Sequence, residues 1–195
     1  MGKRFRTSSH TNTHIFHGQH RFEHWYRDNS VYFITSKVRD GYHAFTSDEA
    51  KAIFWDRFTH WSAHHDFEPW VVSLLSNHYH ILGYLKVGTN LGSMMQKLHG
   101  SVSKLVNDTL PERHLPFWRH AGNQDYFDGC LRSEKQLRRT YPYVLKQAVR
   151  ARLVSRWEDY AHTKRYLTFD DAVARAKARN AYLPTIRYPR YEANN

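Results

Sequence analysis

The sequence predicts an α+β fold of the ferredoxin-like type, an antiparallel sheet built in the order βαββαβ with helices on one face. Two observations lead to this prediction. Short stretches rich in β-branched and aromatic residues recur along the chain, and longer stretches with apolar residues at a 3.6-residue period separate them. After the fourth strand we expect a further helix and then a C-terminal tail.

The first strand is expected over Val31–Val38, where β-branched and aromatic residues alternate with others. Ser47 is a suitable N-cap for the first helix, because Asp48 and Glu49 follow it in the first turn, where acids are favoured. The apolar residues that follow recur at helical spacing, and we expect them to form a core face. They are Ile53, Phe54, Phe58 and Trp61.

A central hairpin is expected to join a strand over Trp70–Leu75 to a strand over His78–Leu85, through a tight turn at residues 76–77. A second helix should follow, with Thr89 or Asn90 as its cap. Its apolar stripe keeps a 3.6-residue period through Leu91, Met94, Met95, Leu98, Val102 and Leu105.

The fourth strand is expected over Tyr126–Arg132. Ser133 and Gln136 form a capping-box pattern behind it, which predicts a helix to about Arg139. Pro142 should interrupt that helix, since proline is best tolerated in a helix's first turn, where its missing N–H is not needed.

We therefore expect a fresh helix from Thr140 to about Leu153, carrying both Tyr143 and Gln147. A last amphipathic helix is expected over Asp170–Ala181, ahead of a basic, aromatic tail from 184 to 195. The chain then divides into an N-terminal arm at 1–27, one domain at 28–166, and a C-terminal helix and tail at 167–195.

The arm is basic and rich in histidine, but its Ser, Thr, Asn and Gly content favours a mobile segment that contacts phosphate over a metal site. Its histidines are His10, His14, His17, His20 and His24.

A single cysteine, Cys130, excludes an intrachain disulfide, and we expect it to be a small buried side chain. No apolar run approaches the roughly 20 residues of a membrane helix, and no secretory signal is visible. These features indicate a cytoplasmic protein.

The formal net charge of +11, with 15% aromatic residues, favours a nucleic-acid partner whose phosphates are bound and whose bases stack. The alternative is a generally basic surface with no specific partner. The cations that we expect to contact nucleic acid are Lys97, Lys104, Arg119, Arg139 and Arg150.

His78 and His80 lie at i and i+2 of a predicted strand, so both side chains should point to one face and form half of a metal site. In a chain with 15 histidines, chance alone gives roughly one His-x-His pair, so the pattern needs structural context. The context is that this pair stands in the most apolar strand region. The alternative is a pair of hydrogen-bonded structural histidines.

Tyr143 and Gln147 have the i, i+4 spacing that places two side chains on one helical face. That face lies away from the apolar stripe, with Arg139 and Arg150 on the same side. A solvated polar face with a surface tyrosine is the alternative. A tyrosine attacks phosphorus efficiently only where the phosphate is polarised and neutralised, and a divalent ion does both. Imidazole and oxygen ligands beside a phosphate indicate Mg²⁺ or Mn²⁺.

Two segments resemble the HUH single-tyrosine transposases, in the version found in REP-associated tyrosine transposases. Residues 76–82 (SNHYHIL) resemble their His-hydrophobic-His strand, and residues 143–154 (YVLKQAVRARLV) resemble their catalytic-tyrosine helix. Trp118, Tyr126-Phe127-Asp128 and the aromatic segment Trp157–Tyr166 are also similar. Ser76 stands where the family often has proline, and Gln147-Ala148 stands where it has Asn-Pro.

The resemblance implies that Tyr143 attacks a single-stranded DNA phosphate, leaving a 5′-phosphotyrosine bond and a free 3′-hydroxyl. It implies that His78, His80 and Gln147 hold the metal, and that the partner is single-stranded DNA with a hairpin. A monomer is favoured over a homodimer. The competing interpretations are a non-catalytic DNA- or RNA-binding module of the same fold, a phosphodiesterase that uses water, and a replication or mobilisation initiator of the same chemistry.

Overall fold

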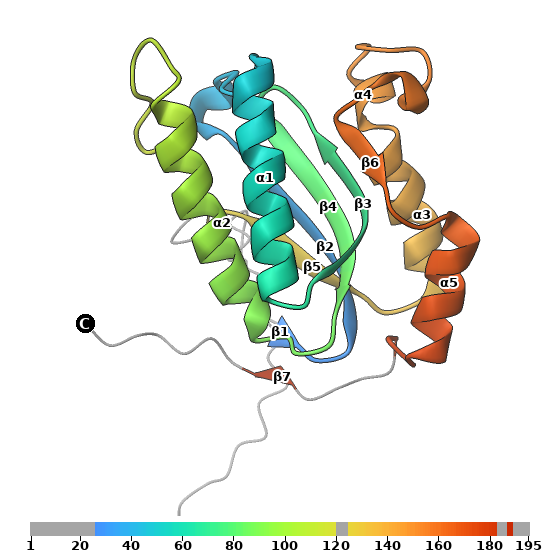
Figure 1. Ribbon diagram of the computed structural model, residues 1–195. Helices are drawn as coiled ribbons and strands as arrows, with labels where there is room; N and C mark the ends of the chain where they lie inside the picture. The colour runs from blue at the N-terminus through green and yellow to red at the C-terminus, as the bar shows by residue number, and fades with distance from the viewer. Residues whose placement is uncertain (1–25, 120–124, 183–186, 189–195) are drawn as a thin grey trace, which may run out of the picture.

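The computed structural model describes residues 26–119, 125–182 and 187–188, and its centre is a five-stranded antiparallel sheet (Figure 1). The strands lie side by side in the order β5-β2-β4-β3-β6. The first four positions of this order are those of the ferredoxin-like fold, and β6 extends the sheet at the β3 edge. The strands are β2 (Ser30–Lys37), β3 (Glu68–Leu74), β4 (His78–Leu85), β5 (Phe127–Leu131) and β6 (Thr163–Arg165).

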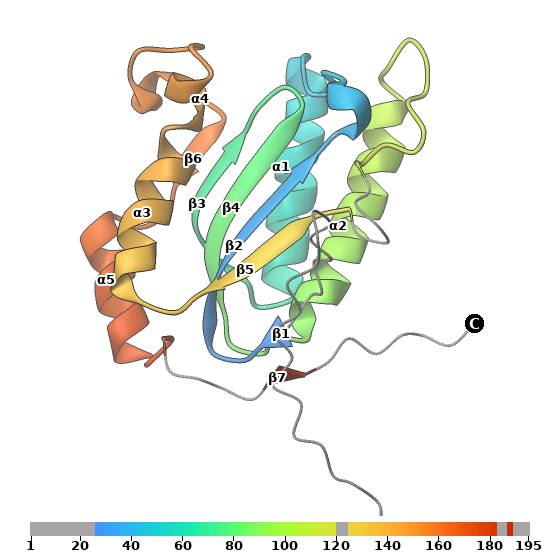
Figure 2. The same ribbon diagram turned by 180° about the vertical axis from the view of Figure 1, so that it is seen from behind.

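Helices cover both faces of the sheet, as the two opposite views show (Figures 1 and 2). α1 (Asp48–His64) and α2 (Asn90–Asn107) lie together on one face, as the sequence predicts. α3 (Glu134–Leu145) and α5 (Phe169–Ala178) pack on the opposite face. The short elements are α4 (Gln147–Arg150), η1 (Arg39–Gly41), η2 (Trp157–Asp159), β1 (Tyr26–Arg27) and β7 (Arg187–Tyr188).

Two of the predicted helix starts are confirmed by their caps, whereas Thr89 precedes α2 without a side-chain capping bond. The Ser47 hydroxyl accepts from the Ala50 N–H at 3.1 Å, where α1 begins. Ser133 accepts from the Gln136 N–H at 3.3 Å, and the Gln136 side chain accepts from the backbone N–H of Arg132 at 2.5 Å. The first of these two bonds at the start of α3 is that of a capping box, whereas the second reaches the residue before the cap rather than Ser133 itself.

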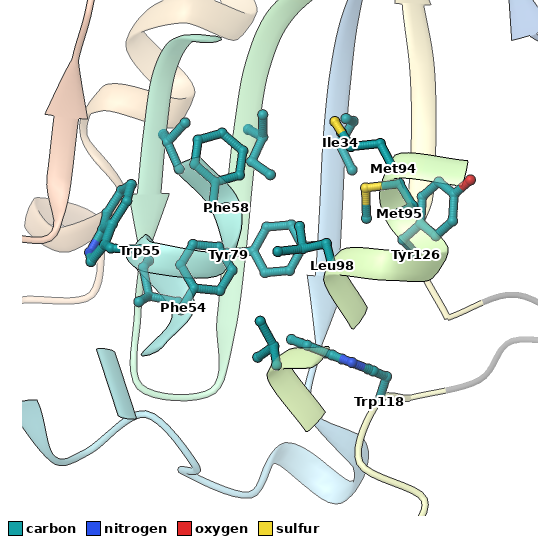
Figure 3. Close-up of a cluster of buried hydrophobic side chains, with 14 of the residues drawn as sticks. Ile34, Phe54, Trp55, Phe58, Tyr79, Met94, Met95, Leu98, Trp118 and Tyr126 are labelled. Carbon is teal, nitrogen blue, oxygen red and sulfur yellow. The ribbon is translucent and has the colours of Figure 1, made fainter. Parts of the chain in front are cut away.

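The larger part of the core lies between the sheet and α1 and α2. Figure 3 shows Phe54 of α1, Tyr79 of β4 and Leu98 of α2 close together, and all three are buried. The Tyr79 oxygen lies 2.6 Å from Nε2 of His99, and Nδ1 of His99 lies 2.5 Å from the carboxylate of Asp125. β4 is therefore anchored on this face by a polar contact as well as by apolar packing.

The prediction that Pro142 interrupts the helix and that a new helix runs from Thr140 to Leu153 is wrong. α3 continues through Pro142, because Tyr141 and Val144, on either side of it, pack into a second buried apolar cluster. This cluster lies between the sheet and the pair α3 and α5. The break comes at Lys146, whose ψ of 17° is not helical, and α4 follows as a single turn.

α4 ends in a Schellman motif, and this is why Leu153 is not helical. Arg152 has a left-handed φ of 57°. The N–H of Leu153 donates to the carbonyl of Ala148 at 3.0 Å. The N–H of Arg152 donates to the carbonyl of Val149 at 3.0 Å.

The two ends of the described chain meet in a two-stranded sheet, where Tyr26 pairs with Tyr188 and Arg27 with Arg187. The segment expected as a tail therefore contains at least this paired stretch. The predicted arm up to residue 25, with its five histidines, lies outside the described residues, as do 183–186 and 189–195. Among the described helices, none has both the length and the apolar character that crossing a membrane requires.

Gly83 in β4 offers a test of the packing between the sheet and the loop before β3. A Cβ at this position would lie 2.5 Å from the ring of Phe67 and 2.6 Å from the carbonyl oxygen of Glu68. We expect Gly83→Ala to lower the free energy of unfolding by about 1–3 kcal/mol, as overpacking does. Gly100→Ala is the control, because nothing lies within 4 Å of its added Cβ. It should raise stability by about 1 kcal/mol, since alanine is the better helix former. Urea unfolding measures both, and equal stability of the two variants would contradict this packing.

Candidate functional site

The His78 and His80 side chains point to the sheet face that carries α3. Alternation along β4 directs Tyr79 and Ile81 into the core under α1 and α2, whereas Leu82 joins the cluster under α3. The two imidazole rings lie side by side with centroids 5.2 Å apart. This is the shared face that the spacing of the two histidines predicts.

Tyr143 reaches the same place from α3. Its ring centroid lies 5.3 Å from that of His80. Phe33 of β2 stacks on His80 at 5.8 Å and meets the edge of Tyr143 at 5.9 Å, so one aromatic ring supports both side chains. The guanidinium of Arg150 lies over the Tyr143 ring, 5.1 Å from its centroid. The structure therefore brings together the histidine pair, the tyrosine and one predicted cation.

Gln147 is buried next to the backbone of Tyr143 rather than exposed on a solvated face. Its side chain is buried, with 6% of its surface exposed, whereas Tyr143 is 37% exposed. The alternative of a solvated polar face is wrong for Gln147, because α3 ends before it and Gln147 is buried in α4. The Gln147 amide nitrogen donates to the Tyr143 carbonyl at 2.9 Å, so its i, i+4 relation to Tyr143 is preserved across the break.

Both histidines are neutral at pH 7. Burial, helped by the positive charge of Lys37, lowers the pKa of His78 from 6.5 to about 4. Burial, helped by the charges of His78 and Lys37, lowers the pKa of His80 to about 3. A neutral imidazole keeps a lone pair on one nitrogen, which is the state that a metal ion requires.

The hydrogen bonds of Asn77 select which nitrogen of His78 carries the proton. The Asn77 amide nitrogen donates to the Gly41 carbonyl at 3.1 Å, so its oxygen faces Nδ1 of His78 at 2.7 Å. An oxygen accepts, so Nδ1 carries the hydrogen and Nε2 keeps the lone pair. Asn77 thus orients the His78 ring.

These residues suit a divalent cation. Nδ1 of His80 is buried and has no hydrogen-bond partner within the described residues, a state that an ion at this nitrogen would relieve. The Gln147 nitrogen is engaged, which leaves its amide oxygen as the end suited to an ion. The described residues contain no group of three or more His, Cys, Asp or Glu side chains placed to hold a metal. A third protein donor to an ion here would have to be of another type, and an amide oxygen is compatible with Mg²⁺ or Mn²⁺.

The five cations predicted to contact nucleic acid do not form one surface. Lys97 and Lys104 are exposed on α2, on the far side of the sheet from Tyr143. Arg119 lines a surface hollow together with His78. Arg139 is exposed on α3, and Arg150 covers Tyr143. Arg150 therefore lies against Tyr143, and Arg119 shares the hollow with His78.

Three neighbours of the site escaped the sequence reasoning. Phe33 was expected only as part of a strand, and Asn77 only as a turn residue. Lys37 stands opposite His78 in the β2–β4 pairing. The local signal for Phe33 and Lys37 was their even spacing along one strand, but the register between β2 and β4 is needed to place them beside the histidines.

No protein-family model matches the sequence, and no curated protein matches it. Among solved structures, the chain is similar to a candidate transposase from Deinococcus radiodurans R1, with a TM-score of 0.42 and 15% identity over 60% of this chain and 89% of that one. It is also similar to a REP-associated tyrosine transposase bound to a REP hairpin, with a TM-score of 0.60 and 17% identity. That match covers 80% of this chain and 86% of the other. At this identity the likeness concerns architecture, and the described chain has the fold of that tyrosine transposase.

Proposed function

We propose that this protein is a transposase-like enzyme that nicks and rejoins single-stranded DNA, with Tyr143 as the nucleophile. The observation that carries the proposal is the 5.3 Å approach of the Tyr143 ring to His80, beside a second neutral histidine. A structural role for two neutral histidines, one buried and one half-buried, would not require an exposed tyrosine on a separate helix beside them.

The reaction that we propose is a transesterification. The Tyr143 oxygen attacks the phosphorus of a DNA phosphodiester, and the bond from phosphorus to the 3′ oxygen breaks. The phenol proton passes to water, and the departing 3′ oxygen takes one up. The products are a 5′-phosphotyrosine and a free 3′-hydroxyl, and attack by a 3′-hydroxyl in the reverse direction rejoins a strand without ATP.

The chain's own residues would bind the metal ion, orient the tyrosine ring and attract the phosphate. His78, His80 and Gln147 are the ligands that we propose for Mg²⁺ or Mn²⁺, which when bound polarises the scissile phosphate as a Lewis acid. Phe33 holds the rings of His80 and Tyr143 in position. The Arg150 guanidinium stands over the tyrosine ring, where it attracts the phosphate toward the phenol oxygen.

The proposed partner is single-stranded DNA that carries a hairpin. The support is the net charge of +11 and the fold shared with a transposase that was solved on a REP hairpin. We propose that the protein acts as a monomer, because His78, His80, Tyr143 and Gln147 all come from one chain in the described arrangement.

The test is to incubate the full chain with a labelled, hairpin-bearing single-stranded oligonucleotide and Mn²⁺ or Mg²⁺. We expect a protein–DNA band that survives denaturation, and we expect EDTA to abolish it. Hairpin binding with no band in any divalent ion would instead favour a non-catalytic binding module. Cleavage with no covalent band would favour hydrolysis by water, and an undiminished band in EDTA would contradict the metal site.

A further inference from the structure

A surface hollow lies beside His78, where β2 ends and β4 begins. The residues that line it come from β2, from the η1 turn, from the hairpin before β4 and from the segment that follows Trp118. They are Lys37, Val38, Asp40, Gly41, Asn77, His78 and Arg119. Because His78 is shared between the hollow and the proposed metal site, a strand bound there would place a neighbouring nucleotide in the hollow.

The walls of the hollow are held by backbone hydrogen bonds. The N–H of Val38 donates to Asn77 at 2.8 Å, and the N–H of Arg119 donates to Lys37 at 2.8 Å. The Asn77 side chain ties the carbonyl of Gly41 to the ring of His78. The hollow is therefore a built feature of the fold that is fixed relative to His78.

The hollow is lined by two cations and one carboxylate, and this combination limits the kind of ligand that it can bind. Lys37 and Arg119 are suited to phosphate, and the cations of the site attract a polyanion. Asp40 opposes that attraction, because its carboxylate carries a negative charge. It pairs with Arg39 at 3.3 Å, but both side chains are largely exposed, so the pair contributes little to stability.

The backbone of Asp40 has a left-handed conformation. Its φ of 55° and ψ of 16° lie in the left-handed region, which asparagine and aspartate adopt more readily than other non-glycine residues, and Gly41 follows with a φ of 70°. This turn brings the Gly41 carbonyl to Asn77 and makes Asp40 part of the lining of the hollow. A carboxylate in this lining is an acceptor that a ligand with N–H donors can use.

We infer that the hollow binds one nucleotide next to the scissile phosphate, and that Asp40 reads its base. This inference rests on the proposed function for the identity of the strand. Lys37 and Arg119 contact the phosphates and carry no sequence information, whereas the carboxylate accepts from base N–H groups. Guanine offers two adjacent donors on its pairing edge and fits best. Thymine fits worst, because two carbonyl oxygens flank its one N–H and repel a carboxylate.

The test measures binding, without divalent ion, so that its result does not depend on cleavage. A pool of single-stranded oligonucleotides with randomised positions beside a hairpin is bound to the full chain, and the bound fraction is sequenced. We expect guanine to be enriched over thymine at one position by about tenfold, within the range of a single bidentate contact. Asp40→Asn should lose most of that preference, and Lys37→Ala should weaken binding of all sequences alike.

Asp40→Asn is a suitable variant because asparagine is among the residues best tolerated in the left-handed region, so the turn is kept. Asp56→Asn is the matched control, since Asp56 is an exposed carboxylate on α1 that also pairs with the adjacent arginine, Arg57. It should leave the base preference unchanged.

An unchanged preference in Asp40→Asn overturns the inference. So does an equal gain in affinity for every base, which would make Asp40 a repelling charge only. If the covalent band is absent while the preference behaves as expected, the proposed chemistry fails and the base-reading hollow stands.

Discussion

Replacing Tyr143 with phenylalanine removes the covalent protein–DNA product and lowers strand cleavage by at least about a thousandfold, the scale of loss when a covalent nucleophile is deleted. The substitution takes away only the attacking oxygen. The ring remains, with its contacts to Phe33 and His80 and the Arg150 guanidinium above it. Stability and hairpin binding should therefore stay close to those of the unchanged protein. Quantifying the denaturant-resistant band, with binding measured in parallel, checks both parts.

Tyr141 and Tyr166 provide matched controls. Tyr141 is two residues away on the same helix, but it is buried and its hydroxyl donates to the carbonyl of Leu167. Tyr141→Phe should cost about 1 kcal/mol of stability for the lost hydrogen bond and leave the covalent band intact. Tyr166 is exposed, and Tyr166→Phe should change neither property. A band that persists in Tyr143→Phe, or that is lost only in Tyr141→Phe, would show that Tyr143 is not the nucleophile.

The sheet and the first two helices could be predicted from the sequence because their signals are local. The stripe from Leu91 to Val102 reports directly which side of α2 is buried, although its last predicted member, Leu105, is 38% exposed. The β-branched and aromatic residues of 31–38 predict a strand, which is buried on both faces at Val31 and Tyr32. The caps at Ser47 and Ser133 fixed where helices begin. The same reasoning failed at Pro142, where a local preference for the first turn of a helix competed with the packing of Tyr141 and Val144. Tertiary packing prevailed, and the helix ran through the proline.

The candidate site was predictable in its members but not in its arrangement. The His78–His80 pair and the Tyr143–Gln147 pair each follow from spacing along one element. That the two pairs meet depends on α3 crossing the sheet over β3 and β4, which no residue of either pair encodes. Gln147 is the clearest case, because its burial requires the break at Lys146. Asp40 likewise joins His78 only through the β2–β4 register and the Asn77 hydrogen bonds.

His80→Ala is expected to abolish metal-dependent cleavage, with a loss of at least about a hundredfold, because it removes a proposed ligand from the centre of the site. Mn²⁺ affinity, measured by calorimetry, should fall in step with cleavage, while hairpin binding without metal should change little.

A second measurement, the pH dependence of stability, needs no metal. Since burial lowers the pKa of His80 to about 3, the unfolded chain binds a proton between pH 6.5 and 3 that the folded chain does not. Acid therefore destabilises the unchanged protein, and His80→Ala should weaken that dependence.

The matched control for this variant is His64→Ala, which removes an exposed imidazole from α1, on the opposite face of the sheet. It should change neither Mn²⁺ affinity nor cleavage, although it removes the same chemical group. The comparison matters because a chain with 15 histidines can bind metal at many places, so loss of total metal binding proves little. Only a loss of affinity that is specific to His80 and accompanied by loss of cleavage supports a catalytic ion. If cleavage in His80→Ala stays within threefold of the unchanged protein, these histidines are structural, and the buried nitrogen of His80 needs another explanation.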